Sequence, residues 1–211
     1  AIGDEIKIGR RGSLTARIAV KGKQGHAAYP QLADNPVPKL ARIIDRLSTA
    51  NIDEGNAHFE PTRLQVTILS VPNTAPNVIP GEAHATLNVR YNDGWSRASM
   101  EAWLEKACAA AAQEVGASFD LDFSGTGDVF LTKAGPLVDA MTTAVRTVTG
   151  RVPRLTTGGG TSDARFIYAH CPVIEFGLVN ATIHQVDERT AIADLEQLTT
   201  IYENFIETYF S

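Results

Sequence analysis

Three loop segments hold the side chains of this chain that could do chemistry. QGHAAYPQLADNP, residues 24–36, places His26 on a turn of small residues directly after an alternating segment. TTGGGTSD, residues 156–163, combines Thr and Ser hydroxyls with glycines that let the backbone approach a ligand. NATIHQVDE, residues 180–188, puts His184 close to two acids. Function concentrates on loops held by a rigid scaffold, so these segments are the first candidates for a site.

Each segment also has a simpler structural interpretation. His26 is either a site residue or an ordinary loop histidine, and His184 is either a metal ligand or a turn histidine, because a lone histidine is a weak metal signal. The glycine segment precedes a helix expected at about Asp163, and helix N-termini bind anions through free N–H groups. It lacks the lysine of a phosphate-binding loop. It therefore indicates a carboxylate-bearing substrate, or simply a tight turn that caps the helix.

Composition restricts the partners of this chain. Its 211 residues include 19 basic and 24 acidic side chains, a net charge of −5, and no basic run, which argues against a nucleic-acid partner. No stretch approaches the roughly 18 apolar residues of a membrane span, and the start has no apolar signal core, so we expect a cytoplasmic protein.

Cys108 and Cys171 fit neither a disulfide framework nor a CxxC metal site, and we expect both to be buried. The chain starts at Ala1 without a methionine, so we expect it to be part of a longer product.

The first 123 residues alternate between strand and helix patterns in the order βαββαβ. Apolar residues at every second position predict strands at 14–21, 63–71, 83–91 and 117–123. Helical spacing predicts one helix that starts near Pro36 after Asp34 or Asn35, and a second, alanine-rich helix that ends at Gly116. The first helix should bury Val37, Leu40, Ala41, Ile44 and Leu47, and the strand at 63–71 should bury Leu64, Val66 and Ile68.

That order predicts an α/β fold that begins with a ferredoxin-like module. Polar residues at alternate positions of every strand indicate an antiparallel sheet with two helices on one face and a wet opposite face. We assign residues 10–124 to this domain.

Residues 125–211 predict a second domain that lacks part of its structure. A helix should run from Pro136 to Gly150, and RLT and PVIEF are short strand candidates. A short helix is expected at 163–168, and Asp194 with Gln197 predicts a capping-box start for a last helix. Three helices on two short strands cannot cover a sheet whose edges need pairing, so further strands must come from elsewhere.

Five segments in this order resemble the di-zinc metallopeptidase family of aminoacylases and carboxypeptidases. They are GRRGSLTARIAVKGKQGHAAYP, DNPVPKL, APNVIPGEAHATLNVRYN, GGGTSDARF and NATIHQVDE. The resemblance covers essentially the whole chain and implies a lid and dimerisation domain followed by the C-terminal part of an α/β zinc-peptidase catalytic domain. In that family a preceding half carries an HxD metal pair, a bridging aspartate and a Glu-Glu pair with the general base, and none of these motifs occurs here.

The resemblance also implies roles for individual residues. His26 would cross a dimer and donate to the oxyanion in the partner's active site, helped by Asn77. Arg90 would clamp a substrate carboxylate through its planar fork. His184 matches a zinc ligand of the family, in which two zinc ions, with cobalt as an alternative, activate a water. The remaining substrate contacts fall on Arg10, Ser13, Tyr29, Gly160, Thr161 and Asn180. Arg10 and Arg90 could instead be solvated strand ends, and Tyr29 a packing residue.

The implied reaction is hydrolysis of the N-succinyl amide of a small dicarboxylate substrate by a homodimer. With one metal ligand and no general base, this chain should be inactive alone. Two alternatives stay open: a non-catalytic dimerisation or binding module, and a related deacylase or carboxypeptidase.

Overall fold

The computed structural model describes residues 3–211, apart from the side chain of Thr126. The chain divides into two compact units. The first, here called the ferredoxin-like unit, comprises residues 11–129. The second, the C-terminal unit, comprises residues 130–211 together with the described residues before Arg11. The C-terminal unit thus takes its first strands from the start of the chain, for which the sequence pattern gave no indication.

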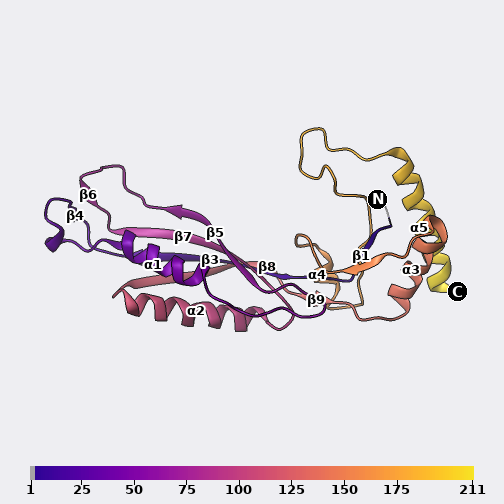
Figure 1. Ribbon diagram of the computed structural model, residues 1–211, viewed down its shortest axis with the longest axis horizontal. Helices are drawn as coiled ribbons and strands as arrows, with labels where there is room; N and C mark the ends of the chain where they lie inside the picture. The colour runs from indigo at the N-terminus through magenta and orange to yellow at the C-terminus, as the bar shows by residue number, and fades with distance from the viewer. Residues whose placement is uncertain (1–2) are drawn as a thin grey trace. The chain divides into compact units, whose positions relative to one another are not determined.

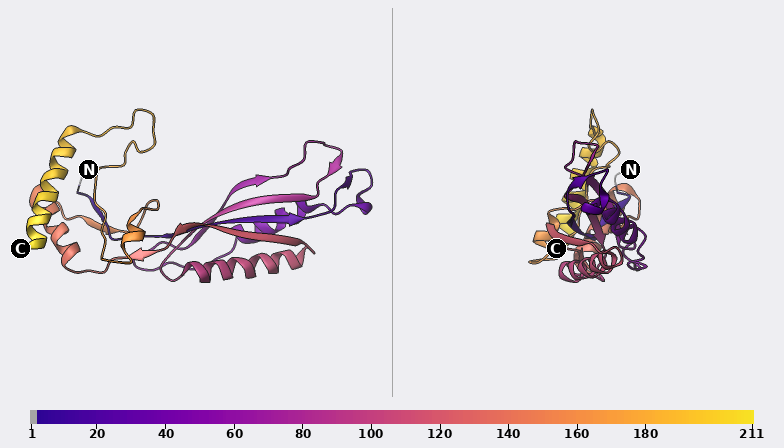
Figure 2. Two further views of the ribbon diagram at one scale, coloured as in Figure 1. Left: turned by 180° about the vertical axis from the view of Figure 1, so that it is seen from behind. Right: turned by 90° about the vertical axis from the view of Figure 1, so that its left-hand side faces the viewer.

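A four-stranded antiparallel sheet forms the ferredoxin-like unit, in the order β5-β7-β3-β8. Its strands are β3 (Gly12–Lys21), β5 (Arg63–Ser70), β7 (Glu82–Tyr91) and β8 (Ser118–Gly127). With helices α1 (Pro36–Ser48) and α2 (Arg97–Glu114), they confirm the expected βαββαβ order. Both helices pack on one face of the sheet, as Figures 1 and 2 show.

The core of this unit is built from alternate residues of the two central strands. In register, Leu14, Ala16, Ile18 and Val20 of β3 lie opposite Val89, Leu87, Ala85 and Ala83 of β7. All eight are at most 2% exposed. The residues between them face the open side of the sheet, which is the pattern of an antiparallel sheet covered on one face only.

Two details of burial differ from the sequence prediction. Helix α1 buries Pro36, Leu40, Ile43 and Leu47, so its buried stripe includes Ile43 rather than Val37 or Ala41. In β5 a bulge between Val66 and Ile68 shifts the register. A bulge adds one residue and moves later side chains to the other face. Ile68 is therefore 57% exposed instead of buried.

The ends of both helices follow the sequence signals. Asn35 caps α1, where its Oδ1 accepts the amide of Val37 at 3.1 Å. Ser96 and Ser99 cap each other reciprocally at the start of α2. Gly116 follows α2 with a positive φ of 58°, a conformation that costs glycine little. Two short strands, β4 (Gly25–His26) and β6 (Val78–Ile79), pair with each other, and the short helix η1 (Pro30–Leu32) follows β4.

The C-terminal unit is built from short strand pairs and three helices. Strand β1 (Glu5–Lys7) pairs parallel with β10 (Arg154–Thr156), and β2 (Gly9–Arg10) pairs antiparallel with β9 (Phe130–Leu131). The helices are α3 (Pro136–Thr149), α4 (Ala164–Ile167) and α5 (Ile192–Phe210). Helices α3 and α5 lie side by side (Figure 1). No described helix is both long enough and apolar enough to cross a membrane.

Three predictions for this unit are wrong. PVIEF forms no strand, because only Glu175 bridges to Lys7. Helix α5 begins at Ile192 after an uncapped Ala191, so Asp194 and Gln197 form no capping box. Asp194 lies instead in the first turn, where its charge favours the positive end of the helix dipole. Cys171 is exposed in the turn after α4, whereas Cys108 is buried as expected. The RLT strand and α3 are confirmed.

Candidate functional site

His26 lies at the end of β4, on a turn held by backbone hydrogen bonds. The next amide, Ala27, donates to the carbonyl of Asn77 at 2.9 Å, which sets the two candidate residues beside each other. The ring Nδ1 of His26 accepts the amide of Ala28 at 3.0 Å. In the neutral ring one nitrogen donates and the other accepts, so the proton is on Nε2. The exposed histidine therefore presents a hydrogen-bond donor to solvent.

Tyr29 lies against His26 on the same turn. Its amide donates to the carbonyl of His26 at 2.9 Å, and the two rings meet edge to face with centroids 5.6 Å apart. Tyr29 is 56% exposed. The structure thus groups Tyr29, His26 and Asn77 at one end of the ferredoxin-like unit.

Asn73 shapes the loop that carries Asn77, and the sequence prediction missed it. Its side-chain amide donates to the carbonyls of Ala75 and Val78 at 3.2 and 2.8 Å, and its Oδ1 accepts the amide of Ala75 at 3.1 Å. Asparagine commonly stabilises turns through such bonds to nearby backbone, and this was the only signal that could have identified it.

Arg90 lies on the open face of the sheet, in β7. Ser13 of β3 is its direct neighbour on one side and Arg63 of β5 on the other. Its Nε donates to Oδ1 of Asn88 at 3.1 Å. Partial burial and the nearby charge of Arg11 lower the pKa of Arg90, and both effects disfavour an isolated cation there. Arginines opposed across strands repel each other, so a bound anion would relieve this position.

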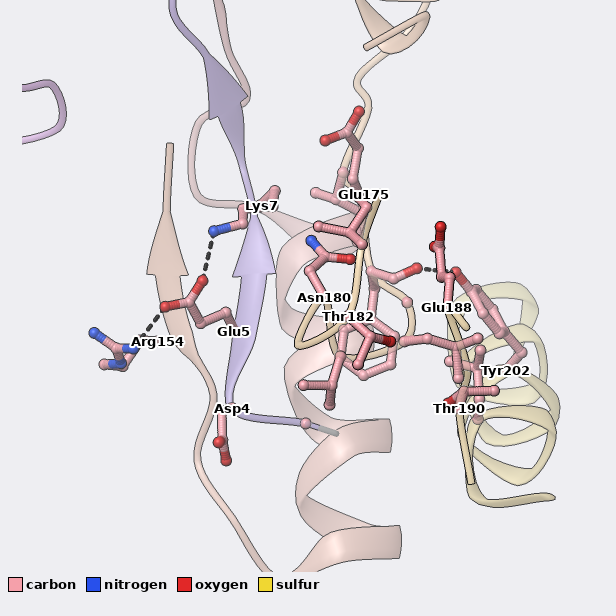
Figure 3. A pocket seen from close by; sticks show the side chains of 18 of the residues that line it. Asp4, Glu5, Lys7, Arg154, Glu175, Asn180, Thr182, Glu188, Thr190 and Tyr202 are labelled. Carbon is pink, nitrogen blue, oxygen red and sulfur yellow. Dashed lines mark hydrogen bonds and ion pairs between the residues drawn. The ribbon is translucent and has the colours of Figure 1, made fainter. Parts of the chain in front are cut away.

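A cavity of about 1130 Å³ occupies the C-terminal unit. Figure 3 shows side chains from β1, the segment after Ile174 and α5 around it. Arg10 and Asn180, two of the candidate substrate contacts, line this cavity, as do Glu175 and Tyr202. Burial raises the pKa of Tyr202, whose hydroxyl donates to the carbonyl of Phe176 at 2.6 Å. Both charged and apolar side chains line the space, which suits an amphipathic small molecule.

The glycine segment lies as an exposed loop between β10 and α4. Gly159 has a positive φ of 108°, and Gly160 and Thr161 are exposed. The carbonyl of Gly158 accepts Nη1 of Arg10 at 2.8 Å, so the segment is fastened to β2. The enclosed Ser162 Oγ has no hydrogen-bond partner among the described residues. The loop therefore exposes Gly160 and Thr161, while the Ser162 hydroxyl is enclosed.

His184 lies in an unusual backbone conformation on the loop that follows Asn180. Its φ is 61°, and its amide donates to Oε2 of Glu188 at 3.1 Å. Thr182 closes the loop by exchanging hydrogen bonds with Arg189, at 3.0 and 3.1 Å. A non-glycine residue held at positive φ is strained, and such strain clusters at functional sites. Across the described part of the chain, no group of three or more His, Cys, Asp or Glu side chains could hold a metal ion.

Known proteins resemble this chain over its whole length. Succinyl-diaminopimelate desuccinylases of Rhodospirillum rubrum and a Methylobacterium species are 51% and 53% identical to it, over 99% and 100% of the chain. The chain spans 53% of each of these relatives, about half their length.

Solved structures share the fold at low identity. An aminopeptidase from Bacillus cereus superposes with a TM-score of 0.81 at 20% identity, covering 99% of this chain and 54% of that one. An M20 family metallo-carboxypeptidase from Sulfolobus solfataricus superposes with a TM-score of 0.74 at 17% identity, covering 97% and 60%. The sequence profile of the peptidase dimerisation domain matches residues 8–116, just over half of the chain. The chain therefore belongs to the peptidase dimerisation domain family of the M20 peptidases.

Proposed function

We propose that this chain is part of a zinc-dependent succinyl-diaminopimelate desuccinylase, which hydrolyses N-succinyl-diaminopimelate to succinate and diaminopimelate for lysine biosynthesis in the cytoplasm. One observation carries this proposal: relatives with that name are about half identical to the chain along all of it. In the proposed reaction, water adds to the succinyl amide carbonyl, and the C–N bond then breaks as the amine takes up a proton.

Arg90 is the proposed clamp for a carboxylate of the substrate. Arg90 is partly buried and lies near two other arginines, Arg63 and Arg11. This concentration of positive charge supports binding of an anion by Arg90. The guanidinium fork can bind a carboxylate through two parallel hydrogen bonds. Ser13, directly across from Arg90, offers a hydroxyl to the same ligand.

His26 is the proposed oxyanion donor. The hydrogen bond from the amide of Ala28 to Nδ1 leaves the proton on Nε2, which supports donation to a developing negative charge. Asn77 and Tyr29 lie next to it and complete the group. Arg10, Gly160, Thr161 and Asn180 are the proposed substrate contacts of the C-terminal unit.

His184 is the proposed metal ligand. Among the described residues, His184 would supply one zinc ligand. A catalytic zinc normally has three or more protein ligands, and the described residues form no such cluster. The strained backbone that presents His184 supports this role. When bound, two zinc ions, or cobalt, would polarise the substrate carbonyl and activate a water. The other ligands and the general base would come from outside these 211 residues.

The activity of a full-length protein containing this chain tests the proposal. With zinc, it should hydrolyse N-succinyl-diaminopimelate, while N-acetylornithine and carboxypeptidase substrates should react far more slowly. Arg90→Lys should lower kcat/KM by about 10- to 100-fold, because an ammonium cannot reproduce the planar fork. Preference for acetylornithine would favour the related deacylase. If none of the substrates is hydrolysed, the chain is better described as a binding module.

We further propose that the protein is a homodimer in which His26 acts in the active site of the partner subunit. A mixture of His26→Ala and His184→Ala subunits should recover about a quarter of the wild-type activity, because half the dimers are mixed and each restores one of two sites. No recovery after subunit exchange would reject the role in the partner's site.

Strand β5 is the proposed contact edge of the dimer. It is an edge strand of the sheet, with Ile68 and Leu69 57% and 60% exposed. Exposed apolar edges favour pairing with another chain. Replacing both residues by lysine should weaken association at least about tenfold in light scattering, since buried lysines are costly. Leu195→Lys on α5 is the control and should leave the dimer intact.

A further inference from the structure

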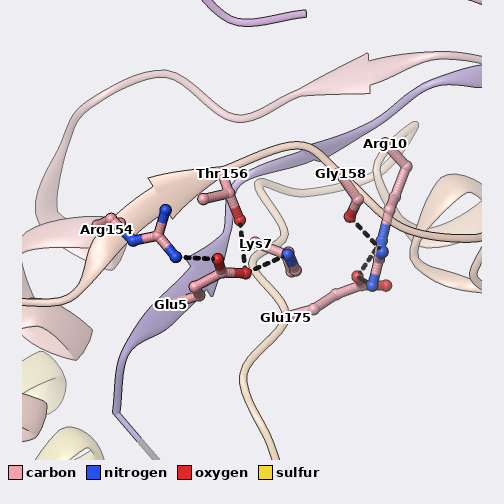
Figure 4. A network of polar contacts seen from close by, with 7 residues as sticks. All are labelled: Glu5, Lys7, Arg10, Arg154, Thr156, Gly158 and Glu175. Atoms are coloured by element: carbon pink, nitrogen blue, oxygen red, sulfur yellow. Dashed lines mark hydrogen bonds and ion pairs between the residues drawn. The ribbon is translucent and has the colours of Figure 1, made fainter. Parts of the chain in front are cut away.

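Arg10 is held on two sides within the C-terminal unit (Figure 4). Its Nε donates to Oε2 of Glu175 at 2.5 Å, and Nη2 forms an ion pair with the same oxygen. Its Nη1 donates to the carbonyl of Gly158 at 2.8 Å. The side chains of Arg10 and Glu175 are only 17% and 21% exposed, so solvent screens this pair less than a surface pair. Arg10 of β2 therefore links the segment at Glu175 to the glycine loop through hydrogen bonds of defined geometry.

Glu175 is itself fixed by backbone hydrogen bonds. Its amide and carbonyl exchange bonds with Lys7 of β1, both at 2.8 Å. The carboxylate therefore starts from a rigid position beside a strand. A side chain anchored in this way can set the rotamer of its partner, which is what positioning a flexible arginine requires.

Some N–H groups of the Arg10 guanidinium remain available to a ligand. A guanidinium has five N–H groups, and the contacts above engage three of them. The other two have no acceptor among the described residues. Because both Nε and Nη2 pair with Glu175, the remaining N–H groups belong to the terminal nitrogens, and Arg10 also lines the cavity of this unit.

The glycine loop packs closely on this guanidinium. A Cβ added at Gly159 would lie 2.2 Å from Nη1 of Arg10, and the positive φ there already disfavours a side chain. Glycine at this position thus lets the loop backbone approach Arg10. The loop continues directly into Gly160 and Thr161, the proposed substrate contacts.

We propose that Glu175 is a positioning residue: its carboxylate sets Arg10, and Arg10 in turn holds the Gly158 carbonyl and orders the loop that carries Gly160 and Thr161. This inference rests on the proposed function for the identity of the substrate. The contact between Glu175, Arg10 and the loop does not depend on it.

Kinetics of the full-length protein give the first test. Glu175→Gln should lower kcat/KM for N-succinyl-diaminopimelate by about 10- to 100-fold, mainly through KM, because a charged hydrogen-bond acceptor is lost. Glu175→Asp should recover part of the loss. In an Arg10→Ala background, Glu175→Gln should change kcat/KM less than about threefold, because the two residues act as one unit. Additive losses would overturn the inference.

The matched control is Glu5→Gln. Glu5 also forms partly exposed ion pairs in this unit, with Lys7 and Arg154, and accepts a hydrogen bond from Thr156 of β10 at 3.4 Å (Figure 4). None of these contacts involves residues 158–161. Glu5→Gln should leave KM unchanged. An equal rise in KM in both variants would show a general effect on the unit and would also overturn the inference.

Loop order in the full-length protein gives a second test that needs no activity. Amide order parameters measured by NMR for residues 158–161 should fall from about 0.85 toward 0.6 in Glu175→Gln and stay unchanged in Glu5→Gln. Unchanged values in Glu175→Gln would reject the positioning role. If the full-length protein fails to hydrolyse N-succinyl-diaminopimelate, the proposed function falls, and the order parameters still decide the role of Glu175.

Discussion

The two units of this chain bury their apolar side chains to very different degrees. In the ferredoxin-like unit, the alternate apolar residues of β3 and β7 are at most 2% exposed. In the C-terminal unit, α5 buries only Ile201 among its described residues. Ile192, Leu195, Ile206 and Phe210 on the same helix are 74%, 45%, 54% and 79% exposed.

The C-terminal unit has a small core of its own, in which α3 packs with Ile6 and Ile201, but it leaves much of the apolar surface of α5 exposed. Large apolar side chains that lie exposed close together on a surface normally mark a contact with other protein. Relatives about twice as long as this chain fit that expectation. The two units therefore differ in how much apolar helix surface they leave exposed.

The largest expected effect compares one leucine from each unit. Leu87→Ala, in β7, should lower the free energy of unfolding by about 2–5 kcal/mol, because Leu87 is fully buried and a cavity would remain. Leu195→Ala should cost less than about 1 kcal/mol, since the side chain is already half exposed. Both tryptophans, Trp95 and Trp103, lie in the ferredoxin-like unit, so their fluorescence in urea reports on that unit. Far-UV circular dichroism follows all the helices, those of the C-terminal unit included. Equal losses would remove the contrast between the units.

A partly buried carboxylate in the ferredoxin-like unit gives the next effect. Asp53 accepts hydrogen bonds from the amides of Gly55 and Thr62 at 2.9 and 3.0 Å, and from the side chains of Asn92 and Trp95 at 2.7 Å each. Asp53→Ala should cost about 1–3 kcal/mol at pH 7, because these donors lose their acceptor. Urea unfolding followed by tryptophan fluorescence measures the loss.

The pH dependence of Asp53 sharpens this prediction. Burial alone would raise its pKa, but hydrogen bonds from Thr62, Trp95 and Gly55 lower the pKa below its ordinary value. Its contribution to stability is therefore present above the unfolded pKa of about 3.9 and is lost as the pH falls through the lower folded value. The gap between wild type and Asp53→Ala should narrow below about pH 4. Glu54→Gln, at an exposed neighbour, should show no such narrowing, and a constant gap for Asp53 would contradict the assignment.

The smallest effect concerns the first turns of the two longest helices. Ser96 caps α2 reciprocally with Ser99, whereas Ala191 gives α5 no side-chain cap. Ser96→Ala should destabilise the ferredoxin-like unit by about 1 kcal/mol, and Ala191→Asp should stabilise α5 by about 0.5–1 kcal/mol. Thermal melts followed by circular dichroism, with Thr190→Ala as a control, measure the second change. A loss of helix in the Ala191→Asp variant would show that α5 starts elsewhere.

Local chemistry made much of the ferredoxin-like unit predictable. Period-two alternation identified β3 and β7. Asn35 located the start of α1, and Gly116 located the end of α2. All of these signals depend only on neighbours in sequence. The bulge in β5 was not predictable, since the register of an edge strand depends on its partner β7.

The candidate site divides in the same way. The sequence by itself singled out His26, His184 and the glycine loop, because their residue types and turn chemistry are local properties. Only the tertiary structure decided that Asn77 lies beside His26, that Arg63 opposes Arg90, and that Glu175 fixes Arg10. The last of these pairs is separated by 165 positions in the chain. Contacts of that kind arise from strand pairing and packing between distant segments, which no local pattern encodes.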